Sequence, residues 1–249
     1  MTGKYDWNKR RKKVHRGRRN RRTGGIQIAG VLVVILIFFV MLIGFVTNTD
    51  APVEASGSNR SDKEFPWYLT LVNYQNHIPE DYEPKLVEVQ GKEQVDERIY
   101  EPLMEMLEAA REGNRGELPL VVSGYRTAEK QQSLYDEKIA EYLKEGYSES
   151  EAEELAKQWV AVPGYSEHQL GFAVDINGAS YDVYLWLQEN SYKYGFIFRY
   201  PGDKTQITGV AEEVWHYRYV GVEAAARMHE QGLCLEEYLE NITGAGNSL

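Results

Sequence analysis

The hydrophobic positions of the chain recur at spacings that predict alternating helices and short strands from residue 95 onward. A helix over residues 95–112 is predicted by apolar side chains three or four residues apart, at Ile99, Leu103, Met106 and Ala110. Similar patterns predict further helices near residues 134–145, 151–159, 179–190, 223–231 and 235–239. Ser148 followed by Glu151 is a capping-box signature, which predicts the start of the second of these helices. Short apolar runs predict strands at residues 117–125, 171–176, 195–200 and 214–220. Elements in this order indicate an α+β fold with a small, mainly antiparallel sheet and surrounding helices.

A long apolar segment precedes this domain. No side chain between Ile28 and Val46 is charged or strongly polar, and the run is 19 residues long. As a helix it would extend roughly 28 Å, which is close to the thickness of a bilayer's hydrocarbon core. A cleaved signal peptide is the main alternative, but its apolar region is usually about 7–15 residues long. Residues 26–46 are therefore predicted to form one transmembrane helix that serves as an uncleaved signal anchor.

Charge is distributed unevenly along the chain. Residues 1–22 carry a net charge of +10, whereas the remaining residues carry −20. Because positively charged flanks stay on the cytoplasmic side of a membrane, we expect residues 1–25 to be a cytoplasmic tail of a single-pass cell-membrane protein and the domain to be extracytoplasmic. Residues 47–64 are small and polar, which predicts a flexible linker before a folded domain over residues 65–249. Since the domain is acidic, no nucleic-acid partner is expected.

Two of the five histidines stand near acidic residues in patterns that suggest chemistry. His168 lies seven residues before Asp175, and His216 lies three residues after Glu213. Asp175 belongs to the apolar run FAVDI, where an unpaired carboxylate would be costly to bury. Gly171 would allow the backbone to turn so that the side chains of His168 and Asp175 converge on one point.

These residues fit either a metal site or a structural cluster. His168, Asp175 and His216 would supply the three protein ligands that catalytic zinc usually takes, and Glu213 would be a general base toward the attacking water. The alternative is a salt-bridged aspartate between two core histidines, and the spacings alone leave both open. Residues three apart in a strand point to opposite faces, so Glu213 and His216 can face one metal only if the chain bends between them or Glu213 precedes the strand.

Three sequence blocks together resemble one enzyme family. SGYR at 123–126, SEHQLGFAVDI at 166–176 and EVWHYRYVG at 213–221 are similar to the signature blocks of VanY-type D-alanyl-D-alanine carboxypeptidases. These are zinc peptidases whose family also includes D-Ala-D-Ala dipeptidases and L,D-carboxypeptidases. The likeness extends over residues 66–240, with the blocks in the same order.

The resemblance implies a role for each matching residue. One Zn²⁺ would be bound by three side chains, those of His168, Asp175 and His216. Glu213 would be the catalytic base, and Arg126 would bind substrate and stabilise charge in the transition state. Weaker candidates for contacts with the end of the substrate peptide are Ser123, Gln131 and Ser166.

The implied function is a zinc-dependent carboxypeptidase that removes the C-terminal D-alanine from peptidoglycan stem peptides outside the membrane. Its expected partners are therefore these stem peptides and the membrane itself. Three alternatives remain open: an L,D-carboxypeptidase acting on tetrapeptide stems, a D-Ala-D-Ala dipeptidase and a wall-binding module without catalysis. The complete ligand set together with Glu213 favours an enzyme, because a binding module has no need of the base.

Overall fold

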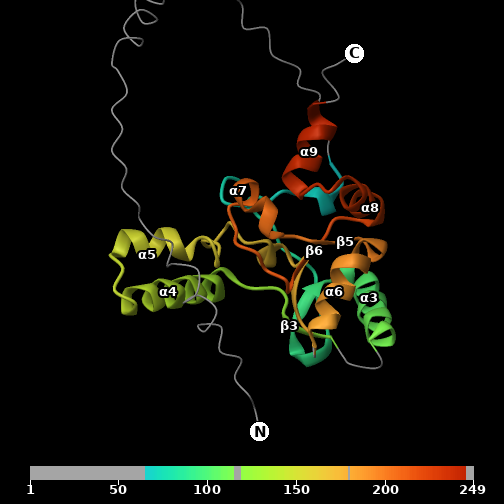
Figure 1. Ribbon diagram of the computed structural model, residues 1–249, viewed down its shortest axis with the longest axis horizontal. Coiled ribbons are helices and arrows are strands. Elements are labelled where there is room, and N and C mark those ends of the chain that lie inside the picture. The colour runs from blue at the N-terminus through green and yellow to red at the C-terminus, as the bar shows by residue number, and fades with distance from the viewer. Residues whose placement is uncertain (1–64, 115–118, 179, 245–249) are drawn as a thin grey trace, which may run out of the picture. The chain divides into compact units, whose positions relative to one another are not determined.

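A four-stranded antiparallel sheet organises the domain in the computed structural model, which describes residues 65–114, 119–178 and 180–244 (Figure 1). Its strands lie in the order β3 (Leu120–Ser123), β4 (Ala173–Asn177), β6 (His216–Tyr219) and β5 (Phe196–Phe198). Every neighbouring pair is antiparallel, which confirms the predicted type of sheet. The central strand β4 is buried from Ala173 to Ile176, because strands flank it on both sides and helices cover the sheet.

The helices of the described ranges surround this sheet. They are α3 (Tyr100–Gly113), α4 (Ala128–Lys144), α5 (Glu149–Ala156), α6 (Tyr181–Asn190), α7 (Thr205–Thr208), α8 (Val222–Gln231) and α9 (Leu235–Gly244). The main hydrophobic cluster joins the sheet to α3 and α6, and a second cluster joins β5 to α8 and α9. Helices α4 and α5 pack on each other through a third, smaller cluster and lie to one side of the sheet (Figure 1).

Alternation along the strands separates an apolar layer from a polar one. Val174 and Ile176 of β4 pack in the main cluster, as does Tyr217 of β6. Successive side chains of a strand point to opposite faces, so Asp175 and His216 point away from that cluster. The sheet therefore presents buried polar side chains on the face opposite its main apolar contacts.

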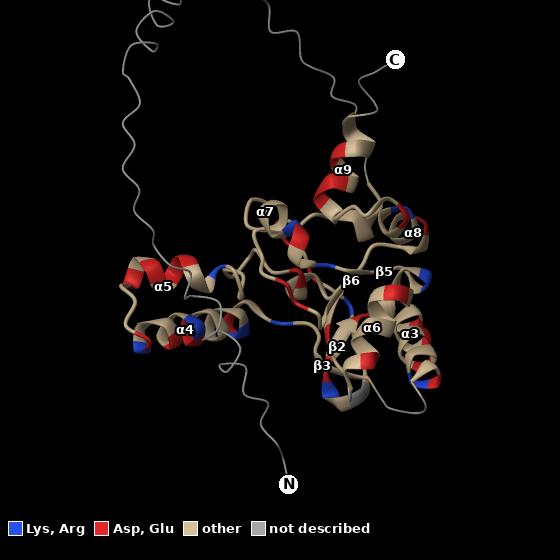
Figure 2. Ribbon diagram, in the orientation of Figure 1, with Lys and Arg blue, Asp and Glu red and all other residues tan. Residues whose placement is uncertain are grey.

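Helix α5 begins with the capping box expected from Ser148 and Glu151. The Ser148 hydroxyl accepts a hydrogen bond from the Glu151 amide, and the Glu151 carboxylate accepts one from the Ser148 amide. Figure 2 shows that several residues along this helix are acidic, and the first turn carries Glu149 and Glu151. Negative charge at a helix N-terminus complements the helix dipole, so both features stabilise the start of α5.

The predicted helix over residues 95–112 is wrong at its beginning. Residues Gln94–Asp96 form strand β2, which pairs antiparallel with β1 (Leu86–Glu88) in a second, two-stranded sheet. A 3-10 turn at Glu97–Ile99 follows, and α3 begins only at Tyr100. Strands of three residues show almost no periodicity, and the four-residue spacing of Val95 and Ile99 imitates a helix.

The N-terminal segments predicted from the sequence lie outside the described residues. These are the cytoplasmic tail, the transmembrane helix and the linker, which together cover residues 1–64. Within the described ranges, every helix is too short or too polar to span a bilayer. All described residues belong to one compact unit of the chain, Asp62–Leu249.

Gly171 makes the turn that brings the second sequence block to the sheet. It follows the 3-10 helix η4 (Glu167–Leu170) with a φ of +76°, in the left-handed region. A Cβ atom there would lie 2.9 Å from the amide nitrogen of Asp96. The expected turn between His168 and Asp175 is thus present, and both conformation and space favour glycine.

We predict that Gly171→Ala destabilises the fold by about 2–4 kcal/mol. The left-handed conformation costs an alanine about 1–2 kcal/mol, and crowding against Asp96 adds a comparable amount. Urea unfolding of the purified protein measures the change. Gly232→Ala is the matched control, because Gly232 also has a positive φ (+64°) but its added Cβ would meet no atom within 4 Å. Equal losses in the two variants would contradict the crowding argument.

Candidate active site

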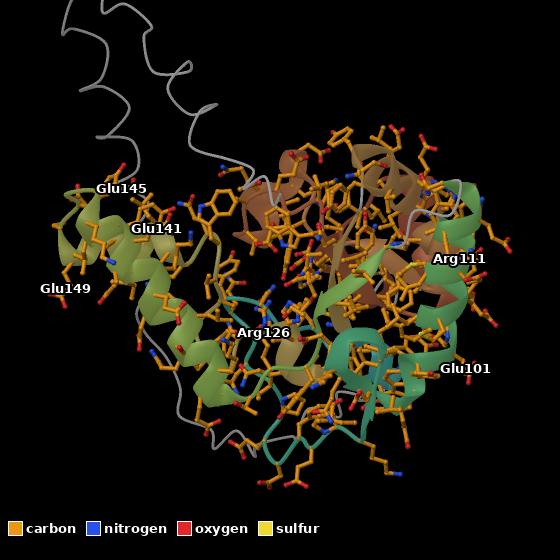
Figure 3. The ribbon with its side chains drawn as sticks, turned by 90° about the horizontal axis from the view of Figure 1, so that it is seen from below. Glu101, Arg111, Arg126, Glu141, Glu145 and Glu149 are labelled. Carbon is orange, nitrogen blue, oxygen red and sulfur yellow. The ribbon has the colours of Figure 1, made fainter. Side chains whose placement is uncertain are left out.

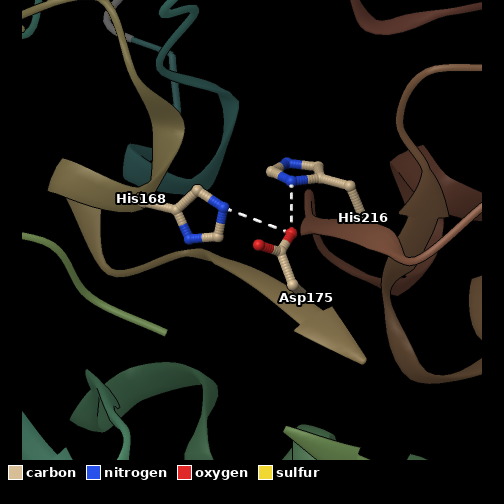
Figure 4. Close-up of side chains that lie close together, drawn as sticks. All are labelled: His168, Asp175 and His216. Carbon is tan, nitrogen blue, oxygen red and sulfur yellow. Dashed lines mark hydrogen bonds and ion pairs between the residues drawn. The ribbon is translucent and has the colours of Figure 1, made fainter. Parts of the chain in front are cut away.

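Three buried side chains converge on one point at the polar face of the sheet. Asp175 and His216 are paired across β4 and β6, and His168 comes from η4 just before β4. The Oδ1 atom of Asp175 lies 3.0 Å from Nδ1 of His216 and 3.3 Å from Nε2 of His168 (Figure 4). The structure therefore brings together the three residues predicted as metal ligands.

The geometry of this group fits a single metal ion. One potential ligand atom from each of the three residues lies within 4.8 Å of the other two. Ligand atoms about 2.0–2.2 Å from a tetrahedral zinc ion are roughly 3.3–3.6 Å apart, and the aspartate oxygen lies 3.0 Å and 3.3 Å from the two imidazole nitrogens. Two imidazoles and one carboxylate also match the donor types of catalytic zinc sites. The remaining nitrogen of His168, Nδ1, lies 2.7 Å from the carbonyl oxygen of Gly124, which leaves Nε2 for the metal.

Glu213 lies beside this group because it precedes strand β6. The His216 amide donates a hydrogen bond of 3.0 Å to the Glu213 carbonyl oxygen, so the chain turns before the strand begins. This turn places the Glu213 carboxylate 3.9 Å from Nδ1 of His216. Both conditions for Glu213 and His216 to face one metal are therefore met: Glu213 precedes the strand, and the chain turns between the two residues. Burial raises the pKa of Glu213 to about 8, although the charge of His216 opposes the shift.

Arg126 connects the group to helix α4. Its Nη2 atom lies 2.6 Å from Oδ2 of Asp175, and its Nε donates a hydrogen bond of 2.8 Å to the hydroxyl of Ser123. Figure 3 shows Arg126 between α4 and the part of the domain that contains the sheet. On the α4 side, its Nη1 lies 3.5 Å from Oε1 of Gln131, whose amide donates to the carbonyl of Ala161. The guanidinium is therefore held from several directions.

The other predicted substrate contacts have different surroundings. Ser123 and Gln131 both contact the Arg126 guanidinium, so they are placed to orient it. Ser166 is buried at the residue before η4 and lies two residues from His168.

The charges at the site shift the pKa values of the three candidate ligands. Burial, together with the positive charge of Arg126, lowers the pKa of His168 to about 4. Burial favours the neutral form of His216, but the carboxylates of Asp175 and Glu167 outweigh it and raise its pKa to about 9. Burial also opposes ionisation of Asp175, yet the two histidines hold its pKa well below the usual range. A metal that binds Nδ1 of His216 must therefore displace a proton.

A set of buried charges behind the site was not predicted from the sequence. Glu167 lies between Arg199 and Arg218, and the side chains of all three are fully buried. Burial opposes ionisation of Glu167, but the two arginines hold its pKa well below the usual range. The only signal in the sequence is an arginine within each of two predicted strands, FIFRY and VWHYRYV. Such residues usually lie at exposed positions, so the pattern did not reveal the cluster.

The site residues fall within a region that matches one known family. A family model described as VanY, D-alanyl-D-alanine carboxypeptidase, matches residues 92–222, which include all the candidate ligands, Glu213 and Arg126. By class the protein is thus a carboxypeptidase, as the sequence blocks implied. More specifically, the chain belongs to the VanY family of D-alanyl-D-alanine carboxypeptidases.

Individual relatives agree with this family. The chain is 51% identical over 201 residues to a D-alanyl-D-alanine carboxypeptidase of Enterococcus faecalis, which covers 79% of this chain and 74% of that protein. It is 55% identical to a vancomycin resistance D,D-pentapeptidase VanY variant solved with Zn(II), with a TM-score of 0.67 over 70% of this chain and 99% of that one. VanYB in complex with D-alanine-D-alanine has the same identity and TM-score, over 70% and 98%.

We predict that Glu213→Gln stabilises the chelator-treated protein at alkaline pH. The Glu213 carboxyl has a pKa of about 8 in the folded protein, above its usual value of about 4.5. The fold therefore loses stability as pH rises from about 4.5 to 8 and stays at the reduced level above that pH. Glutamine lacks this cost. Its advantage should grow across that window to a few kcal/mol, at about 1.4 kcal/mol for each tenfold difference in proton affinity.

Urea unfolding at pH 5, 7 and 9 measures this difference. Glu212→Gln is the matched control, since it removes an exposed carboxyl from the preceding residue. If the stability advantage of Glu213→Gln stayed constant between pH 5 and pH 9, ionisation of the buried Glu213 carboxyl would not be what destabilises the fold.

Proposed function

We propose that the protein removes the C-terminal D-alanine from peptidoglycan stem peptides ending in D-Ala-D-Ala, with Zn²⁺ held by His168, Asp175 and His216. The observation that carries the proposal is the buried group of these three side chains with the Glu213 carboxylate beside it. It is supported by the relatives named above, one of which was solved with Zn(II) and another with D-alanine-D-alanine.

Zinc at this site would supply Lewis-acid polarisation of the scissile carbonyl and of the attacking water. Glu213 is placed to accept the proton of that water at its carboxylate and to pass it to the departing amine. It must be ionised to do so, and a divalent cation nearby favours the ionised form of a buried carboxyl. The turn before β6 thus holds the base at the side of the ligand group.

Arg126 is the candidate for recognising the negative charge of the substrate. Its side chain is 17% exposed, so a ligand can reach a guanidinium that the protein already holds in place. A guanidinium offers a fixed fork of donors to a terminal carboxylate or to a developing oxyanion. Ser123 and Gln131 contribute by orienting this fork, and the buried Ser166 precedes the ligand His168 by two residues.

The test compares three substrates side by side: a pentapeptide stem, a tetrapeptide stem and free D-Ala-D-Ala. We predict that the pentapeptide is preferred and that a single D-alanine is released, which mass spectrometry detects. Preference for the tetrapeptide would identify an L,D-carboxypeptidase, and preference for the dipeptide would identify a dipeptidase. Failure to cleave any of them by a zinc-loaded protein would favour a binding module.

Two variants assign the roles within the same assay. Glu213→Gln should retain zinc but lower kcat by about 10²–10⁴-fold, because the attacking water loses its proton acceptor. His168→Ala should lose the metal itself, as measured by zinc content after gel filtration. Near-normal turnover by Glu213→Gln would remove Glu213 from the role of base.

We also propose that residues 26–46 anchor the protein in the cell membrane, with residues 1–25 in the cytoplasm and the enzyme domain outside. The support is the apolar run of 19 residues behind a segment of charge +10. A linker over residues 47–64 would have a typical reach of roughly 20–25 Å as a flexible chain. The domain would then act on wall close to the membrane.

Protease treatment of intact, wall-stripped cells tests this topology. We predict that the domain is digested while a small N-terminal fragment stays protected, as seen with antibodies to each end of the chain. Protection of the whole chain would place the domain inside the cell, and digestion with no protected fragment would indicate a cleaved or unanchored protein.

A further inference from the structure

The carboxylate of Glu167 lies at the second ring nitrogen of His216. While Nδ1 of His216 faces Asp175, its Nε2 atom lies 3.5 Å from Oε2 of Glu167. Both the imidazole and the carboxylate are buried, with side-chain exposures of 4% and 0%. Among the described residues, neither Nε2 of His216 nor Oε2 of Glu167 has a hydrogen-bond partner. These two atoms can therefore form a hydrogen bond with each other.

The chemistry of an imidazole ligand requires such a partner. A histidine that offers the lone pair of Nδ1 to a metal carries its proton on Nε2. Leaving that N–H buried without an acceptor would cost about 1–3 kcal/mol. Oε2 of Glu167 is the acceptor within reach, and a shift of a few tenths of an ångström would bring the pair to ordinary hydrogen-bond distance.

The Glu167 carboxylate is itself fixed by two buried arginines. Nε of Arg199 donates a hydrogen bond of 2.8 Å to Oε1, and Nη1 of Arg218 lies 3.1 Å from the same oxygen. Arg199 is held in turn by Glu236 of α9 through hydrogen bonds of 2.9 Å and 2.7 Å. Because the arginines engage Oε1, the other carboxylate oxygen is left to face His216.

We propose that Glu167 is a positioning residue for the metal ligand His216. By accepting the proton on Nε2, it selects the tautomer and ring orientation that turn Nδ1 toward the metal, while Arg199 and Arg218 hold the carboxylate in place. The inference rests on the proposed zinc site, but it assigns a role to a residue outside the ligand set and the base.

Zinc affinity of the full-length protein, measured by competition with a chromophoric chelator, tests the role. Glu167→Gln should weaken zinc binding about 10–100-fold, which is the usual effect of losing the partner of a ligating histidine. Glu236→Gln is the matched control, because Glu236 also binds Arg199 but is not among the groups that contact His216. Both variants disturb the buried charges, as urea unfolding of the metal-free forms would report, but Glu236→Gln should lose much less zinc affinity, because Glu167 keeps Arg218 and its place at His216.

The outcomes separate the two proposals. If the wild-type protein binds no zinc, both the proposed metal site and the proposed role of Glu167 are wrong. If wild type and Glu167→Gln bind zinc equally well, only the positioning role is wrong. The same holds if Glu236→Gln loses as much zinc affinity as Glu167→Gln does.

A measurement on the wild type covers the case in which Glu167→Gln does not fold. In zinc-loaded protein labelled with ¹⁵N-histidine, NMR should show His216 with Nδ1 bound to the metal and Nε2 protonated, with its proton protected from exchange. Metal bound to Nε2, or a rapidly exchanging Nε2 proton, would overturn the inference.

Discussion

The buried charge of Asp175 is the constraint on which the rest of the site depends. Asp175 belongs to the central strand β4, where its register partners are Ser123 on one side and His216 on the other. A carboxylate in that position is costly unless it is paired, and His168, His216 and Arg126 all direct nitrogen atoms toward it. The sequence left two alternatives open, a metal site and a salt-bridged aspartate between two histidines. In the structure, the same three side chains form both. The group that neutralises the aspartate is also the group shaped to hold a metal.

Because side chains alternate along a strand, further buried charges lie on the same face of the sheet as Asp175. His216 and Arg218 are two residues apart on β6, so they share the face that Asp175 occupies on β4. Glu167 then meets both of them, and Arg199 links it to Glu236 on α9. Removing one partner from such a buried ion pair usually costs about 3–5 kcal/mol, whereas an apolar replacement of the whole cluster is often neutral for stability. Stability alone therefore gives little reason for so many buried charges, while the placement of a ligand gives one.

Features with a local cause could be predicted from the sequence, and those created by tertiary contacts could not. The run FAVDI predicted β4, and the Ser148–Glu151 pair predicted the start of α5, because both signals lie within a few residues. Strands β1 and β2 are too short to show a period. The first turn of α4 is polar and begins with a Thr127 cap, so apolar spacing placed the helix too late. The contacts of Ser123 and Gln131 with Arg126 depend on where α4 lies relative to the sheet. The spacing of residues along the sequence does not predict that arrangement.

The link from Glu167 through Arg199 to Glu236 also determines when the buried charges find their partners during synthesis of the chain. Glu236 lies in α9, so the ribosome makes it after Glu167, Arg199 and Arg218. Until α9 docks, Arg199 lacks one of its two carboxylate partners. A growing chain can therefore form β4 and η4 long before the charges behind His216 are balanced. The set of buried charges next to the candidate metal ligand His216 is therefore complete only after α9 has been made and has docked.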